Sequence, residues 1–399
     1  MNRSVNEQAI ITSLSAALDA VGESGKKDEF DLAIILHHAE KEPHSVDKRL
    51  SQLLDILKAD LELKIFDGAM QVLPNAAMRM DYSWLGRWLV RRGLKVGVEQ
   101  AVADLRRYLD TSEIPYLLTF ALSGIEVSEP CDLGRRVRLL PWEQVPESDQ
   151  KQIIHEKFIM ASDFRWPTAA VVREETLTKI YTHDTEVQKY MIPLDDTDLR
   201  DAILCIGLTG PTAPFVLASW FTPPPWAPVM GSGFSMPFPE GRPRHEKWPP
   251  SYSAEASELF QAFVGLTPPR KDILRLVMQR LNGAMRRLSN VDSAIDLGIA
   301  LESLFLDDMD DERGELTFRL RIRASRFMAK NRVDRERIYK LVGYLYSARS
   351  SATHSGRVSP TIQGRPTNEI LEEGYRLTAD TVKRFIITGK PDWTTILFE

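Results

Sequence analysis

Hydrophobic residues near the start of the chain recur at spacings of three and four, which is the period of an amphipathic helix. On this basis we predict helices over residues 9–21, 30–40, 46–58 and 98–109. Pro43 ends the second pattern, because proline cannot continue a helix. Residues 61–72 fit a helix and a strand equally well, so both assignments stay open.

Short β-type runs separated by turn residues replace the helical pattern from about residue 115 to residue 250. We predict strands over residues 116–122, 136–140, 169–172, 203–208 and 216–221. Residues 222–250 are rich in proline, glycine and aromatic residues, and proline excludes long helices there. We interpret this stretch as a surface linker. The alternative is a substrate-contacting loop that uses Trp226, Phe234, Phe238 and Trp248.

The helical period returns at Ser253, and it predicts helices over residues 270–287, 292–306, 316–330, 335–350 and 367–388. Four or five antiparallel helices of this length form a bundle. The predicted fold class is therefore α+β multidomain, with a mixed α/β N-terminal part and an all-α C-terminal bundle. The predicted domains are 1–112, mostly helical; 113–250, β-rich or mixed with the proline-rich linker; and 251–399, the helical bundle.

The composition is that of a soluble globular protein, with 399 residues, 43% hydrophobic and 27% charged. No run of about 18 apolar residues occurs, so we expect no membrane span. The polar start, Met1 to Gln8, lacks the apolar core of a signal peptide. Cys131 and Cys205 have no metal-type spacing and suit a reducing cytoplasm. We therefore expect a cytoplasmic protein.

Charge is distributed unevenly along the chain, whose formal net charge is -5. Residues 270–360 carry 18 Lys and Arg against 12 Asp and Glu, whereas residues 1–269 carry 28 against 38. The basic stretch suits a polyanionic substrate that is held locally. A solvated helical surface is an equally good interpretation of charge alone.

Arg349 and His354 lie inside this basic stretch, in the segment Leu345 to Gly356. Cleavage of an RNA backbone by its own 2′-hydroxyl needs a base, an acid and a cation at the phosphorus, and these two side chain types supply them without a metal. We expect the helix to end near Gly356, because glycine adopts the left-handed cap conformation easily. His354 then lies in the last turn, where the helix dipole favours the protonated imidazole, and Ser350 lies one turn before it on the same face.

One histidine cannot easily act as acid and base at once. Two copies of the chain across a two-fold axis supply two histidines and two arginines, which predicts a homodimer with a composite site. Glu302 is a supporting residue, because a carboxylate inside an apolar helix is costly unless it pairs, here with Arg321, Arg323 or Arg349. Tyr346 can stack on a base or, as we prefer, pack at a helix interface.

The region from about residue 260 to residue 390 resembles the HEPN superfamily, and most of all the ApeA-like HEPN proteins of bacterial antiphage defence. The matching segments are Ala294 to Phe305, the arginine-rich helix Phe318 to Met328, and Leu345 to Gly356. The residue after the family's arginine is often Asn, Asp or His, and ApeA-like members also show the serine found here as Ser350. The family's usual His-Gly is His354-Ser355-Gly356 in this chain.

This resemblance implies an α-helical, often dimeric, metal-independent endoribonuclease that needs no cofactor, in which Arg349 and His354 are catalytic. The arginine-rich helix offers Arg321 and Arg323 as RNA-binding residues. We expect residues 1–250 to sense a trigger, either a phage protein or a small molecule, or to restrain the nuclease. The alternatives are a catalytically silent HEPN dimerisation or binding module, and DNA as the substrate.

Other clusters fit the usual sites poorly. His37, His38 and His44 have no zinc-type spacing, and we expect no metal site. The acidic run from Asp307 to Glu312 lacks the order of a calcium loop, so we interpret it as a solvated loop.

Overall fold

The chain folds into two compact units, each assembled from three stretches of sequence. A computed structural model describes residues 3–24, 48–74, 76–159, 166–184, 186–191, 193–210, 212–229, 246–308 and 315–398. The first unit combines residues 1–118, 174–194 and 220–233, and the second combines residues 119–173, 195–219 and 234–399. The predicted division at residues 112 and 250 groups residues by secondary structure, whereas the compact units join segments that are distant in sequence.

Helices pack against one another in the first unit, with α1 in contact with three others. They are α1 (Arg3–Ser24), α3 (Lys48–Ala59), α4 (Tyr82–Val96) and α5 (Val98–Asp110), with 3-10 turns η1 (Leu61–Phe66) and η3 (Val187–Tyr190). The predicted helices over residues 9–21, 46–58 and 98–109 are confirmed. The predicted helix over residues 30–40 lies outside the described residues.

A small antiparallel sheet completes the first unit, in the order β2–β1–β8. Its strands are β1 (Met70–Leu73), β2 (Ala76–Arg79) and β8 (Tyr181–Thr182). The ambiguous residues 61–72 thus divide into the turn η1 and most of strand β1. Tyr181 attaches β8 to α5, because its hydroxyl lies 2.5 Å from that of the buried Tyr108. Burial raises the pKa of Tyr181 to about 12, so this pair of hydroxyls stays protonated at neutral pH.

A second sheet has the strand order β5–β6–β7–β3–β9. Its strands are β3 (Glu113–Ser123), β5 (Cys131–Gly134), β6 (Val137–Pro141), β7 (Ala169–Thr178) and β9 (Phe215–Thr222). The pairs β5–β6 and β6–β7 are antiparallel. The predictions over residues 116–122, 136–140, 169–172 and 216–221 are confirmed. The chain passes between the two units within β3, β7 and β9.

The predicted strand over residues 203–208 is wrong, because these residues end helix α7 (Thr197–Ile206). The run from Ile203 to Ile206 is buried on all sides, so it shows no helical alternation of apolar and polar residues. A short apolar run of this kind fits a buried helix as well as a strand.

The proline-rich stretch contributes to the second unit instead of lying wholly at the surface. Glu246–Trp248 form strand β10, which pairs in parallel with β4 (Ile125–Val127). Trp248 is buried, and its indole N–H donates to the Thr209 hydroxyl over 2.8 Å. This burial excludes Trp248 from the predicted substrate-contacting loop. Trp226 is half-buried under the Arg107 guanidinium, and Phe234 and Phe238 lie outside the described residues.

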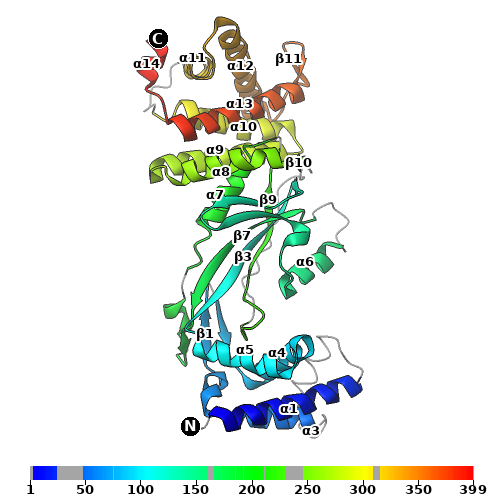
Figure 1. The fold of residues 1–399 in the computed structure, drawn as a ribbon. Coiled ribbons are helices and arrows are strands. Elements are labelled where there is room, and N and C mark those ends of the chain that lie inside the picture. The colour runs from blue at the N-terminus through cyan, green and yellow to red at the C-terminus, as the bar shows by residue number, and fades with distance from the viewer. Residues whose placement is uncertain are drawn as a thin grey trace. The chain divides into compact units, whose positions relative to one another are not determined.

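From Ser253 onward the second unit is helical apart from one short hairpin (Figure 1). Its helices are α8 (Ser253–Val264), α9 (Pro268–Arg286), α10 (Asn290–Phe305), α11 (Leu316–Met328), α12 (Arg332–Ser355), α13 (Thr367–Thr388) and α14 (Trp393–Phe398), and the hairpin joins β11 (Thr361–Ile362) to β12 (Arg365–Pro366). Helix α10 is central, because it contacts α9, α11, α12 and α13. The unit also contains α6 (Asp149–Ile159) and the 3-10 turns η2 (Trp142–Gln144) and η4 (Pro250–Tyr252). The mixed α/β composition with a helical C-terminal region is as predicted.

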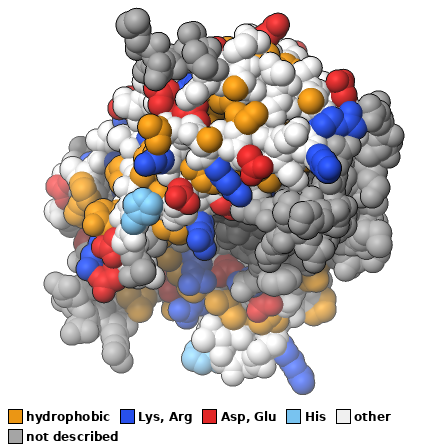
Figure 2. All heavy atoms as spheres, turned by 90° about the horizontal axis from the view of Figure 1, so that it is seen from below, with side chains coloured by type: hydrophobic (Ala, Val, Ile, Leu, Met, Phe, Trp, Pro, Cys, Tyr) orange, Lys and Arg blue, Asp and Glu red, His pale blue; other side chains and the backbone are white. Residues whose placement is uncertain are grey.

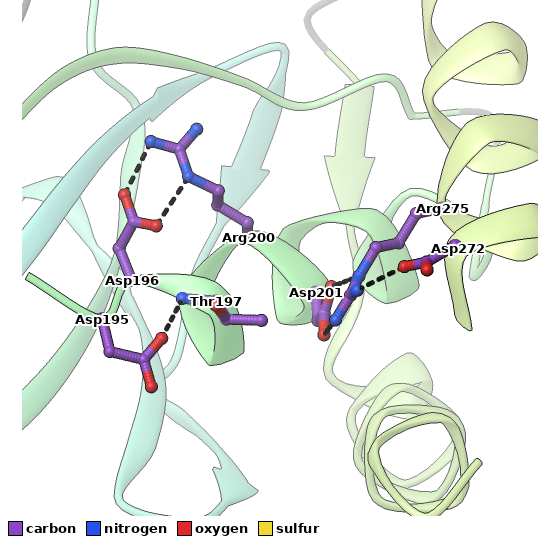
Figure 3. Close-up of polar contacts among 7 residues, drawn as sticks. All are labelled: Asp195, Asp196, Thr197, Arg200, Asp201, Asp272 and Arg275. Atoms are coloured by element: carbon purple, nitrogen blue, oxygen red, sulfur yellow. Dashed lines mark hydrogen bonds and ion pairs between the residues drawn. The ribbon is translucent and has the colours of Figure 1, made fainter. Parts of the chain in front are cut away.

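Ion pairs surround helix α7 and attach it to α9 (Figure 3). Arg275 donates from Nε and Nη2 to the two carboxylate oxygens of Asp201, both over 2.8 Å, and the Asp201 side chain is only 3% exposed. These hydrogen bonds raise the pKa of Arg275. At the start of α7, Asp196 accepts two hydrogen bonds from Arg200, and the Asp195 carboxylate accepts one from the Thr197 N–H. This buried bidentate pair joins α7 to α9.

We predict that Asp201→Asn lowers the free energy of unfolding of the second unit by about 2–3 kcal/mol, because Arg275 loses a buried, doubly hydrogen-bonded partner. Asp272→Asn is the matched control, since Asp272 pairs with the same guanidinium but is 72% exposed. Its expected loss is below about 0.5 kcal/mol. Urea denaturation measures both, and equal losses would contradict the assignment of Asp201.

Candidate functional site

Helices α10 and α12 approach each other closely at Gly298, where Arg349 of α12 crosses α10. A methyl group at residue 298 would overlap the Cγ of Arg349 and lie 2.9 Å from its Cβ. The absence of a side chain at Gly298 therefore makes room for the aliphatic stem of Arg349. This contact fixes the direction in which the Arg349 side chain projects from α12.

The guanidinium of Arg349 is held at its far end by Glu302. Its Nη2 donates to the Glu302 carboxylate over 3.1 Å, and the two side chains are 28% and 27% exposed. Gly298 and Glu302 are four residues apart on α10, so they lie on one face of that helix. The Arg349 side chain thus follows α10 for about one turn, with its stem on Gly298 and its charge at Glu302. Of the three arginines considered as partners of Glu302, the structure selects Arg349.

His354 lies in the last turn of α12, as predicted, and it is exposed. Gly356 ends the helix with φ 64° and ψ 17°, and its N–H donates to the Ala352 carbonyl. The serine at position 355 therefore does not move the helix end away from the glycine. The Ser355 hydroxyl donates to the Ser351 carbonyl over 2.7 Å, which reinforces this last turn.

Arg349 and His354 are five residues apart, which is about 140° of rotation and 7.5 Å of rise on a helix. The structure thus places them on one helix but on different faces. Ser350 is half-buried and lies one turn before His354, while Tyr346 is half-buried and lies one turn before Ser350. Half-burial of Tyr346 agrees with packing between helices, and its role in base stacking stays a prediction.

The buried carboxylate of α10 is Asp296, whereas the sequence pattern had indicated Glu302. Asp296 is 3% exposed and accepts one hydrogen bond from Arg280 and one from Arg287, each over 2.9 Å. Asp296 was overlooked because its neighbours in the sequence are mostly apolar. Its charge is paired with two arginines in and just after the C-terminal part of α9. Glu302 is half-buried and closer to solvent.

Arg323, predicted to bind RNA, is instead buried and engaged within the protein. Its side chain is 9% exposed, and it donates to the Phe305 carbonyl and to both oxygens of Asp308. Burial raises the pKa of Asp308, but the hydrogen bonds and charge of Arg323 outweigh it, so the net pKa is lowered. A guanidinium held in this way has few donors left for a phosphate, and RNA binding by Arg323 stays a prediction.

Arg321 is half-buried, and its role in RNA binding stays a prediction. Its guanidinium stacks 3.7 Å from the centroid of the Tyr339 ring, and its Nε donates to the Tyr339 carbonyl. Asp307 and Asp308, at the start of the acidic run, pair with Lys390 and Arg323 instead of lying free in solvent.

The remaining candidates are the histidine cluster and the acidic run. His37, His38 and His44 and the end of the acidic run lie outside the described residues. No group of three potential metal ligands occurs among the residues that are described. Within the same part of the chain, no helix has both the length and the apolar character required to cross a bilayer. No protein-family model matches this chain, and no curated protein or solved structure is significantly similar to it.

We predict that Gly298→Ala lowers the free energy of unfolding by about 1–3 kcal/mol, because the added methyl group forces the Arg349 stem or the two helices apart. The loss should be smaller by at least about 0.5 kcal/mol in an Arg349→Ala background, which lacks the overlapping Cγ. A double-mutant cycle in urea measures this coupling. Equal losses in the two backgrounds would show that the contact is absent.

Proposed function

We propose that the protein is a metal-independent endoribonuclease of the HEPN type, and that its C-terminal helical region carries the site. One observation carries this proposal. Arg349 is positioned across two helices by Gly298 and Glu302, while His354 is exposed at the end of the same helix. An anchored cation and an exposed acid–base group are the two components that metal-free phosphodiester cleavage requires, and here both come from the last two turns of one helix.

In the proposed reaction a base removes the proton of the ribose 2′-hydroxyl, and the oxygen attacks the adjacent phosphorus. The bond from phosphorus to the 5′-oxygen breaks, and an acid protonates that leaving oxygen, which leaves a cyclic phosphate. His354 serves as acid or base. Arg349 stabilises the negative charge on the phosphorus centre, because a guanidinium has five donors and Glu302 occupies one of them.

Both proton transfers call for two histidines, so the active species is a homodimer in which each copy contributes Arg349 and His354. Residues 1–250 recognise a trigger, either a phage protein or a small molecule, or restrain the nuclease, in a cytoplasmic defence or growth-arrest response. The support for this role is the position of these residues before the helical region, since a fold by itself does not specify a function.

A silent dimerisation or binding module is the second candidate, and one observation favours it. The Arg349 guanidinium pairs with Glu302, and its stem packs on α10, which is also what a purely structural arginine does.

We predict that the purified protein cuts single-stranded RNA in EDTA and leaves DNA of the same sequence intact, because only RNA has the 2′-hydroxyl. Arg349→Ala and His354→Ala should each reduce the rate by about 10²–10⁴-fold. Lys340→Ala is the matched control on the same helix, since its ammonium pairs with the exposed Glu336. Gel analysis of labelled strands measures the rates.

Two results would favour the silent module: RNA that stays intact with the wild-type protein, or cleavage that both alanine variants retain. Induced expression in bacteria, with and without phage challenge, extends the comparison to a triggered state. Equal growth and equal RNA integrity for wild type, Arg349→Ala and His354→Ala would then exclude the nuclease.

We also predict that activity per chain falls on dilution, because a site shared by two copies is lost when they separate. Sedimentation should show the dimer dissociating over the same concentration range. Activity per chain that stays constant where the protein is monomeric would contradict the composite site without contradicting the nuclease.

A further inference from the structure

We propose that the first unit binds a phosphorylated planar ligand of nucleotide size in a cavity of about 310 Å³ beside the β1–β2 hairpin and α4. Arg79 of β2, Arg87 and Trp84 of α4, and Asp81 before α4 line this cavity together with apolar residues of the hairpin. The inference goes beyond the proposed nuclease and does not rest on it.

The two arginines lack the partners that arginines of the second unit have. Within the described part of the chain, neither Arg79 nor Arg87 makes a hydrogen bond or an ion pair, although Arg87 is half-buried. Arg79 is exposed, so the cavity is open to solvent, and its guanidinium lies beside Gly68. Two unpaired guanidiniums at one cavity suit a phosphate group, which they bind through charge-assisted hydrogen bonds.

Trp84 supplies a ring for the planar part of the ligand. It lies three residues before Arg87, so the two side chains are neighbours on one face of α4. Trp84 is half-buried, and the indole therefore presents part of its surface to the cavity. Aromatic stacking and arginine–phosphate contacts are the pair of interactions by which proteins commonly hold nucleotides.

The carboxylate in the cavity does not neutralise both arginines. Asp81 accepts from the Ser83 hydroxyl and from the Trp84 N–H, each over 2.6 Å, which caps α4. Two guanidiniums and one carboxylate leave a net charge of +1 at the cavity. On the face drawn in Figure 2, acidic and basic side chains are interspersed with hydrophobic ones, whereas the lining of this cavity has two arginines and one carboxylate.

Size also distinguishes this cavity from the larger one, about 790 Å³, that lies between α1 and α3. Among the described residues that line the larger cavity there is no arginine or lysine, and Asp55 is the one that is charged. The smaller cavity is near the low end of the range of about 300–1,000 Å³ for ligand pockets, which suits one mononucleotide.

The test titrates the full-length protein with AMP, GMP, CMP and UMP, and with adenosine and inorganic phosphate as the separate halves of the ligand. Calorimetry and tryptophan fluorescence report binding. We expect saturable binding of at least one monophosphate, and weaker binding of both halves. The double variant Arg79→Gln/Arg87→Gln should bind that monophosphate at least about tenfold more weakly, since each guanidinium loses charge-assisted hydrogen bonds.

Lys95→Gln is the matched control, because Lys95 is exposed on the same helix and does not line the cavity. It should bind within about twofold of wild type. Trp84→Leu should weaken binding and remove most of the fluorescence change, and thermal melting confirms that each variant is folded. The proposal is overturned if no monophosphate binds at about 1 mM. It is also overturned if the double variant binds as wild type does, or if phosphate alone binds as tightly as the nucleotide.

Discussion

The close approach of α12 to α10 at Gly298 is the constraint on which the candidate site depends. Because Gly298 has no side chain, the stem of Arg349 lies against α10 and its charge reaches Glu302 one turn further along. An arginine that is already ordered loses less conformational entropy when it binds an anion. Glu302 offsets part of its charge, so a phosphate must share the guanidinium with the carboxylate. The pair therefore gives Arg349 a fixed position at the cost of some of its electrostatic attraction.

Much of the fold could be predicted from local pattern, and the exceptions depend on contacts between distant segments. Helix α13 was predicted with its observed bounds, because its apolar residues repeat regularly over 22 residues. Helix α7 was not, because its last four residues, Ile203–Ile206, are all buried and this short apolar run carries no period. Trp248 was assigned to a surface stretch because its neighbours are prolines, whereas its indole bonds to Thr209 inside the second unit.

In the candidate site, too, local sequence predicts some features and contacts between distant segments determine the others. The end of α12 at Gly356 and the place of His354 in the last turn follow from local sequence, because a left-handed glycine cap needs no distant partner. The partner of Glu302 could not be chosen among three arginines, since the choice depends on how α12 packs on α10. Burial of Arg323 was missed for a related reason: one of its partners is the backbone carbonyl of Phe305, which no residue type reveals, and the other, Asp308, is recognised only once α11 is packed beside the end of α10.

Ion pairs of arginines in the second unit weaken the inference of a polyanionic substrate from the net charge of residues 270–360. Residues 270–360 contain an excess of basic residues, but Arg280 and Arg287 share Asp296, and Arg323 binds Asp308. These guanidiniums hold the protein together, so the net charge of the segment overstates the cations that RNA can reach. The case for a polyanionic substrate then rests on the end of α12, where His354 is exposed and Arg349 is partly exposed. A local site of this kind favours recognition of one phosphate over binding along an extended strand, because counterion release grows with the number of phosphates contacted.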